Sequence, residues 1–173
     1  NCRVVAAWST CQAVSSPWWR HGPAQGFFLF RTAGRKHRTT LLAGFTTVRN
    51  LGLFVKTGGY LLDVALARAI DNGWIDGPRI VPAGHAITPT GGHLDPTMFE
   101  RLGPDIMPLS VEEGIANGVH EVRKAVRYQI KYGARLIKIS ASGGVMSHSG
   151  LAGAQQYSEE ELAAIVDEAH RAG

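Results

Sequence analysis

The sequence predicts an α/β fold built on a parallel sheet, and two observations carry this prediction. From about residue 38 onward, short segments rich in β-branched residues alternate with longer segments of helical periodicity. Their order is helix, strand, helix, strand, loop, helix, strand, loop, helix, which is typical of right-handed crossovers between parallel strands. A barrel and an open, flavodoxin-like sheet both fit this alternation. Periodicity alone does not separate the two.

The first expected elements form a helix–strand junction. Residues 39–43 close a helix, and residues 45–50 form a short β-branched strand. A second helix is expected over residues 60–72, with Gly73 as its stop, and a strand over residues 79–83 follows it. The apolar face of this second helix is expected to comprise Leu62, Leu66, Ala69 and Ile70.

A long loop and two further helices complete the chain. Residues 84–108 are rich in Gly, Pro and His, and a loop of this length is a candidate functional loop. A strand is expected over residues 136–140. Ser158 and Glu161 are expected to form a capping box for a helix through Arg171. The helix before that strand has the clearest period, with apolar residues at Val119, Val122, Val126 and Ile130.

The composition changes sharply along the chain. Eight of the 18 Lys and Arg residues, but none of the 14 Asp and Glu residues, precede Asp63, so the rest carries a net charge of −4. Both cysteines, Cys2 and Cys11, and three of the four tryptophans lie in the first twenty residues. We therefore expect residues 1–37 to be an irregular, atypical basic segment, distinct from residues 38–173.

The composition also indicates which partners and which cellular location to expect. The segregated charge does not favour a nucleic-acid partner. No stretch reaches the roughly 18 uninterrupted apolar residues of a membrane span, so no membrane association is expected. Two cysteines without a cluster of partners are read as free thiols, which favours a cytoplasmic location.

Lys138 is the residue that the predicted fold does not explain. In a strand over residues 136–140, Ile137 and Ile139 point to one face, which helices must cover, and Lys138 points to the other. An unpaired ammonium in a barrel interior would cost several kcal/mol. Three arrangements resolve this cost: a buried ion pair, a Schiff-base lysine, or a carbamylated lysine that bridges two metal ions.

Six sequence blocks, in the same order, resemble the imidazolonepropionase-like and prolidase-like amidohydrolases. The resemblance runs from about residue 38 to residue 173, and several blocks in the right order are far more specific than any one alone. The blocks are residues 41–52 (LLAGFTTVRNLG), 77–80 (GPRI), 84–93 (GHAITPTGGH), 133–139 (GARLIKI), 142–145 (SGGV) and 157–162 (YSEEEL).

The resemblance implies a partial (β/α)8 TIM barrel, about strands two to four with their helices. It implies that Lys138 lies on the fourth strand, is carbamylated and bridges two divalent ions, usually zinc. Hydroxide activated by these metals then attacks a peptide-like or cyclic amide C–N bond. The implied substrate is a small-molecule amide or dipeptide.

The chain also departs from this family. The resemblance implies a His-x-His metal pair on the first strand, but residues 1–37 contain only His21 and His37. Two later histidines and an aspartate of the family have no counterpart before residue 173. We therefore expect the catalytic residues to lie outside this chain, and the chain alone to be inactive. Asn50 replaces the family's usual aspartate.

Three histidines are candidate substrate contacts. His85 and His93 lie in the long loop, at the end of a barrel where active sites are built, and His148 follows the Gly143–Gly144 pair. His120 and His170 are expected on helix surfaces.

Two alternatives to the metal hydrolase stay open at this point. Lys138 in a strand followed by a glycine loop also suits a Schiff-base aldolase. The non-enzymatic alternative is an inactive truncated barrel, which would be compatible with a homo-oligomer formed through unpaired strand edges.

Overall fold

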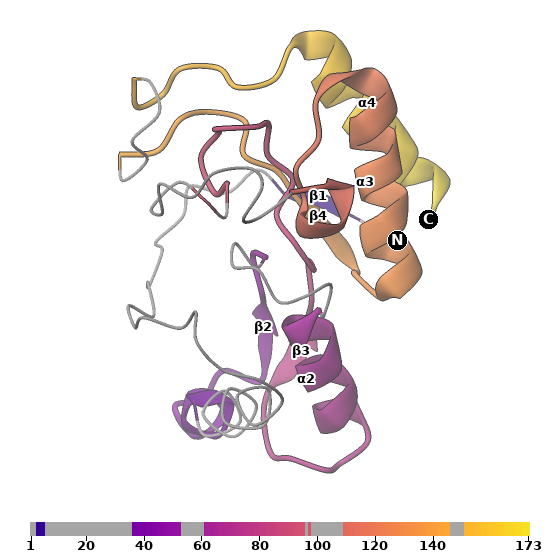
Figure 1. Cartoon of the computed structure of the whole chain (residues 1–173). Helices are drawn as coiled ribbons and strands as arrows, with labels where there is room; N and C mark the ends of the chain where they lie inside the picture. The colour runs from indigo at the N-terminus through magenta and orange to yellow at the C-terminus, as the bar shows by residue number, and fades with distance from the viewer. Residues whose placement is uncertain (1–2, 6–35, 53–60, 96, 98–108, 146–150) are drawn as a thin grey trace.

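The computed structural model describes residues 3–5, 36–52, 61–95, 97, 109–145 and 151–173 (Figure 1). Residues 36–42 are helical. The other elements are β1 (Arg3–Val5), β2 (Thr47–Arg49), α2 (Leu62–Asp71), β3 (Arg79–Val81), η1 (Val111–Glu113), α3 (Gly118–Tyr132), β4 (Leu136–Lys138) and α4 (Glu159–Arg171).

The strands pair in parallel, as the alternation of elements predicted. In one pair β2 lies beside β3, with Val48 opposite Ile80. In the other, β1 lies beside β4, with Val5 opposite Lys138. The strand β1 corrects the expectation of an irregular segment at residues 3–5. A three-residue strand has no periodic signature, and its partner lies more than 130 residues away, so only tertiary pairing with β4 defines it.

The larger hydrophobic core lies between α3, α4 and β4. Figure 1 shows the two helices side by side next to β4. Ile137 and Ile139 point into this core, as the period of two predicted, and they meet Val122 and Val126 of α3 and Ile165 of α4. All five side chains are buried. The apolar stripe predicted for α3 is therefore confirmed.

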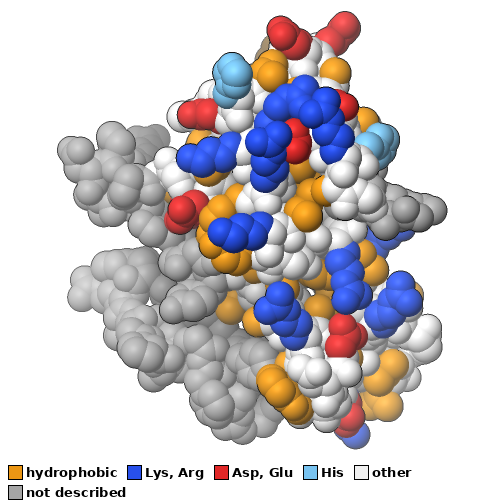
Figure 2. All heavy atoms as spheres, turned by 90° about the vertical axis from the view of Figure 1, so that its right-hand side faces the viewer, with side chains coloured by type: hydrophobic (Ala, Val, Ile, Leu, Met, Phe, Trp, Pro, Cys, Tyr) orange, Lys and Arg blue, Asp and Glu red, His pale blue; other side chains and the backbone are white. Residues whose placement is uncertain are grey.

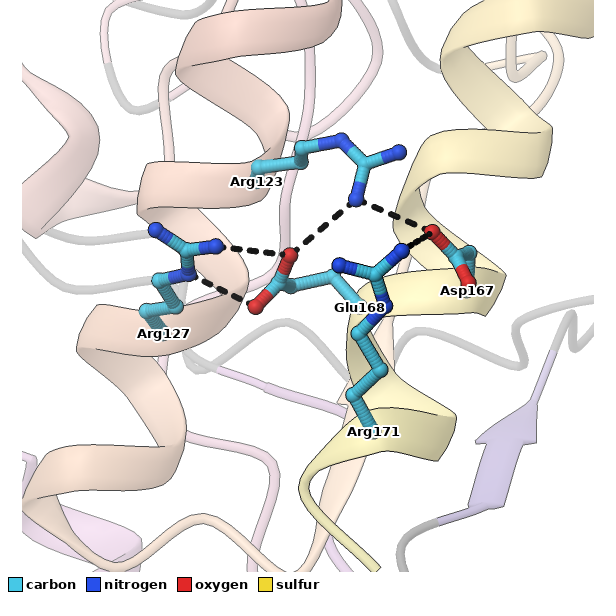
Figure 3. Close-up of polar contacts among 5 residues, drawn as sticks. All are labelled: Arg123, Arg127, Asp167, Glu168 and Arg171. Atoms are coloured by element: carbon cyan, nitrogen blue, oxygen red, sulfur yellow. Dashed lines mark hydrogen bonds and ion pairs between the residues drawn. The ribbon is translucent and has the colours of Figure 1, made fainter.

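An ion-pair network joins the outer sides of α3 and α4 (Figure 3). Glu168 accepts hydrogen bonds from Arg127 Nε at 2.6 Å and from Arg123 Nη1 at 3.2 Å. Arg123 also donates to Asp167, which pairs with Arg171 at 3.0 Å. In Figure 2, Lys and Arg side chains lie on this face with acidic side chains between them. The network thus ties the two helices together at the surface.

The capping box at the start of α4 is formed as predicted. Ser158 Oγ accepts a hydrogen bond from the Glu161 N–H, and Glu161 Oε2 accepts from the Ser158 N–H at 2.7 Å. Glu161 Oε1 also accepts from the Gly118 N–H at 2.7 Å, so the same carboxylate connects the first turns of α3 and α4. These bonds with Ser158 and Gly118 lower the pKa of Glu161, because they favour its charged form.

A smaller hydrophobic cluster lies between α2, β2 and β3. Its buried members are Leu66, Ala67 and Ile80. The buried face of α2 differs from the expected one: Leu62 and Ile70 are half-buried, whereas Asp63, Val64 and Ala67 are also buried. The face is rotated because the first turn of α2 packs toward the C-terminus of α3, where a Cβ on Gly133 would lie 2.8 Å from Val64 Cγ1.

The bridges of the segment after β3 correct the first part of the predicted loop over residues 84–108, which was expected to have no strand-like pairing. Ile87 forms a parallel bridge with Ile139, and Thr88 forms one with Ile115. The segment therefore runs beside β4 as a short, irregular continuation of the strand region. Sequence periodicity does not reveal it, because Gly84 and Pro89 interrupt any alternation. Within the described residues, no helix is both long and apolar enough to cross a membrane.

Candidate functional site

Lys138 lies at the carboxyl end of β4 and is buried, with 4% of its surface exposed. Its neighbours in sequence, Ile137 and Ile139, belong to the α3–α4 core, so Lys138 lies on the opposite face of the strand. Burial lowers the pKa of Lys138, because removal from water disfavours the charged ammonium. The predicted burial of this lysine is confirmed.

The backbone around Lys138 is held by the segment after β3. The Lys138 carbonyl accepts a hydrogen bond from the Ile87 N–H at 2.8 Å, and the Ile87 carbonyl accepts from the Ser140 N–H at 2.9 Å. Ser140 is buried beyond the strand end, and its Oγ has no hydrogen-bond partner among the described residues. The site therefore contains a buried hydroxyl as well as a buried amine.

His93 is brought close to Lys138. The pKa of His93 is lowered, first by burial and then by the positive charge of Lys138. Its backbone is fixed on both sides: the His93 N–H donates to Gln156 Oε1 at 3.1 Å, and Thr88 Oγ1 donates to the His93 carbonyl at 2.8 Å. A Cβ on Gly144 would collide with the imidazole ring. The ring is thus held between two loops, and its Nδ1 has no partner within the described residues.

The histidines expected in the other loop positions and on helix surfaces fall into three groups. His85 is fully buried, and its N–H donates to Gln129 Oε1 at 2.9 Å. His148 lies outside the described residues. His120 and His170 are exposed on α3 and α4, as predicted. Of the three candidate substrate contacts, the structure therefore places His93 near Lys138.

Asn50 follows β2 and closes a local turn. Its Oδ1 accepts a hydrogen bond from the Gly52 N–H at 3.0 Å. A Cβ on Gly52 would lie 2.9 Å from the Ala86 nitrogen, so this turn packs directly against the segment that carries His85. Asparagine thus supplies the same kind of acceptor oxygen that an aspartate would supply here.

Two residues in the surroundings of the site were not singled out in the sequence. Asp63 in the first turn of α2 is 2% exposed, and Gln129 on α3 is fully buried. Asp63 accepts a hydrogen bond from the Gly84 N–H, and Gln129 accepts one from the backbone N–H of His85. A signal for Asp63 was available, because it precedes Leu66 and Ala67 by three and four positions and so shares their buried helix face.

A metal site cannot be assembled from the described residues alone. Among them, no group of three His, Cys, Asp or Glu side chains could hold a metal ion. Lys138 could contribute one ligand after carbamylation, so a metal here requires further ligands from elsewhere.

The chain belongs to the amidohydrolase family, whose model matches residues 13–173. The resemblance found in the sequence is thereby confirmed. Ochratoxinase from Aspergillus niger is 39% identical over 140 residues, which make up 74% of this chain and 27% of that relative. The chain therefore spans about a quarter of the length of this relative.

Solved structures of amidohydrolases have the same fold. A Xaa-Pro dipeptidase with bound methionine superposes with a TM-score of 0.73 at 35% identity, over 90% of this chain and 36% of that chain. A prolidase in complex with N-methylphosphonate-L-proline gives 0.69 at 38% identity, over 85% and 35%. The Aspergillus niger ochratoxinase structure gives 0.71 at 31% identity, over 90% and 37%. These neighbours confirm the α/β class.

Proposed function

We propose that a longer protein containing this chain is a binuclear metal-dependent amidohydrolase, which hydrolyses the C–N bond of a small-molecule amide or dipeptide. The observation that carries the proposal is Lys138, a buried lysine at the carboxyl end of a parallel strand, in a chain of the amidohydrolase family. A lysine is rarely this buried, and the carboxyl ends of barrel strands are where active sites are built.

In this proposal β2, β3 and β4 are the second to fourth strands of a (β/α)8 barrel. Residues 3–5 are excepted from the segment 1–37 that was expected to lie outside it, because β1 pairs in parallel with β4. The parallel pairing of β2 with β3 supports this order. So do the hydrogen bonds from the segment after β3 to β4, such as that from the Ile87 N–H to the Lys138 carbonyl. The longer protein is proposed to be cytoplasmic, without nucleic-acid or membrane partners.

Lys138 would become a carbamate. The lone pair of its neutral amine forms a bond to the carbon of CO2, and one proton leaves to solvent, so a neutral side chain becomes an anion. The carbamate can no longer take up a proton to become a buried cation, and it carries two oxygen atoms that could bind metal. When bound, two divalent metals, zinc in this proposal, would polarise the amide carbonyl and provide the nucleophile.

The histidines of this chain would contact the substrate. His93 is proposed to stay neutral near pH 7, because burial, the larger cause, lowers its pKa. Its Nδ1 has no partner among the described residues and could form a hydrogen bond to the substrate. His85 and His148 are proposed as further contacts at the same end of the barrel.

The substrate class follows from the similar proteins. One is called an ochratoxinase and others are a Xaa-Pro dipeptidase and a prolidase, and these names refer to amide or peptide substrates. We propose that this protein acts on a C-terminal amino acid linked through an amide. Xaa-Pro dipeptides and ochratoxin are therefore the first substrates to test.

The test compares two lysine substitutions in the longer protein, with zinc and bicarbonate supplied. Lys138→Ala is expected to abolish metal binding and amide hydrolysis, and Lys138→Arg should not restore them, because a guanidinium does not form a carbamate. Lys131→Ala, at an exposed position on α3, is the matched control and should keep both. Retained metal and activity in Lys138→Ala would overturn the proposal. Borohydride trapping of a carbonyl substrate on Lys138 would replace it with the Schiff-base reaction.

A further inference from the structure

Three consecutive backbone N–H groups after β3 are satisfied by buried side chains instead of by a neighbouring strand. The N–H groups of Ala83 and Gly84 both donate to Asp63 Oδ2 at 2.9 Å. The next N–H, that of His85, donates to Gln129 Oε1 at 2.9 Å. Each of these buried donors would otherwise be left without a partner, at a cost of about 1–3 kcal/mol.

This segment lies between β2 on one side and β4 on the other. The Val81 carbonyl accepts from the Asn50 N–H at 3.1 Å, and the Pro82 carbonyl accepts from the Leu136 N–H of β4 at 3.3 Å. Pairing with β4 resumes at Ile87, whose N–H donates to the Lys138 carbonyl. Between Pro82 and Ile87 the ladder is interrupted, and Gly84 adopts a φ of +70° there. A Cβ on Gly84 would collide with Gln129 Oε1, so the acceptor fits only against a glycine.

The two acceptors come from different parts of the molecule. Asp63 lies in the first turn of α2, beside the smaller hydrophobic cluster, and Gln129 lies on α3, beside the larger core. Both are almost completely enclosed. A displacement of either helix would therefore be transmitted to the backbone of Gly84 and His85.

We propose that Asp63 and Gln129 are positioning residues for the site around Lys138, because they set the path of the backbone that carries His85 and leads to His93. The inference rests on the proposed function, since it names residues that arrange the same site without touching the substrate. After residues 83–85, the Ile87 N–H donates a hydrogen bond to the Lys138 carbonyl, and Thr88 Oγ1 donates one to the His93 carbonyl at 2.8 Å. The backbone held by Asp63 and Gln129 therefore comes directly before the residues that bond to Lys138 and His93.

The first experiment measures amide hydrogen exchange by NMR in the chain and its variants. Asp63→Ala is expected to speed exchange at Gly84 by at least about tenfold, while the amides of Val122 and Val126 in the core of α3 are unchanged. Asp63→Asn retains one oxygen that can accept from both amides, so it should restore most of the protection. Gln129→Met, which has a similar shape but no acceptor, should speed exchange at His85.

The control is Asp71→Ala, at the other end of α2. The Asp71 side chain is 42% exposed and forms a 3.8 Å ion pair with Arg135. The substitution therefore removes a carboxylate from the same helix but none of the hydrogen bonds to residues 83–85. The imidazole resonances of His85 and His93 should shift in Asp63→Ala and Gln129→Met, but not in Asp71→Ala. A purely structural role would leave these resonances unmoved in the folded state.

Three results would overturn the inference. The first is a uniform increase of exchange in α3 and at residues 83–85, which means that Asp63 supports only global stability. The second is that the histidine resonances do not shift, and the third is that Asp63→Asn does not restore protection. These readouts need no activity, so they decide the inference even if the unaltered longer protein hydrolyses no amide, a result that would defeat the proposed function alone. If it does hydrolyse one, Asp63→Ala should lower kcat by at least about tenfold with KM within about threefold.

Discussion

The region around α3, α4 and β4 and the region around α2, β2 and β3 are stabilised by different means. The first has an extensive core, an ion-pair network on its surface and a capping box at the start of α4. The second has a core of three buried residues, and Leu61, the N-cap residue of α2, forms no side-chain cap. Lys138 belongs to the first region, whereas Asp63, which holds the backbone before His85, belongs to the second.

This difference teaches that the candidate site depends on both regions but draws its rigidity mainly from one. Stability is rarely uniform across a structure, and parts with few buried apolar contacts open at lower free energies. We expect the α2 region to open first, and with it the bonds from Asp63 to Ala83 and Gly84. Four predictions test this comparison, in order of decreasing expected effect.

Core truncations should separate the two regions most strongly. Ile165→Ala, at a fully buried position in the larger core, should lower the free energy of unfolding by about 4 kcal/mol, because the rigid surroundings leave a cavity. Leu66→Ala, in the smaller cluster, should lower it by about 2 kcal/mol, since fewer neighbours enclose that side chain. Urea denaturation measures both. Val145→Ala, at a 91% exposed position, is the control, and equal losses for Ile165 and Leu66 would contradict the comparison.

Removing Glu168 should have the next largest effect. Glu168 is buried while Arg127 is exposed, so Glu168→Gln should lower the free energy of unfolding by about 1–2 kcal/mol at pH 7. The hydrogen bond from Arg127, followed by that from Arg123, lowers the pKa of Glu168 in the folded state. This contribution is therefore present above the ordinary value of 4.5 and is lost as the pH falls through the lower folded pKa.

The pH dependence gives the measurement for Glu168. The difference in unfolding free energy between the unaltered chain and Glu168→Gln should shrink as the pH is lowered from 7 to 3. A difference that grows toward acid pH would show that the charge of Glu168 does not stabilise the helix pair.

The capping box should contribute about 1 kcal/mol. Ser158→Ala removes the oxygen that accepts from the Glu161 N–H, so one donor at the start of α4 loses its partner. Ser158→Asp retains an acceptor and should recover most of the loss. Thermal unfolding followed by circular dichroism measures both variants. If Ser158→Ala and Ser158→Asp unfold at the same temperature, the cap is not a source of the difference between the regions.

Exposed ion pairs should have the smallest effects. Arg171→Ala breaks an i,i+4 pair with Asp167, and Arg38→Ala breaks a 3.8 Å pair with Asp76 near the smaller cluster. Each should change the unfolding free energy by about 0.5 kcal/mol or less, since solvent and salt screen both pairs. Urea denaturation at low and high salt provides the measurement. A loss above about 1 kcal/mol for either variant would mean that surface charge contributes to the difference.

Short-range patterns in the sequence predicted much of the larger region. The spacing of Val119, Val122 and Val126 predicted α3, and Ser158 with Glu161 predicted the start of α4. The period of two in the segment around Lys138 correctly assigned its face of β4. These predictions hold because each depends on residues within two to four positions of one another, where local geometry determines which side chains share a face. The division of the chain at residues 37 and 38 stays a prediction.

Only the tertiary structure decided the rest. The strand β1 and the proximity of His93 to Lys138 have no local signature. The bonds that hold the segment after β3 span 21 residues from Asp63 to Gly84 and 44 residues from His85 to Gln129. By itself, the sequence determined the helices, the parallel class of the sheet and the buried lysine. The relation between that lysine and its histidines arises from contacts between distant segments, because backbone donors that leave a strand ladder must find their acceptors wherever the packed helices supply them.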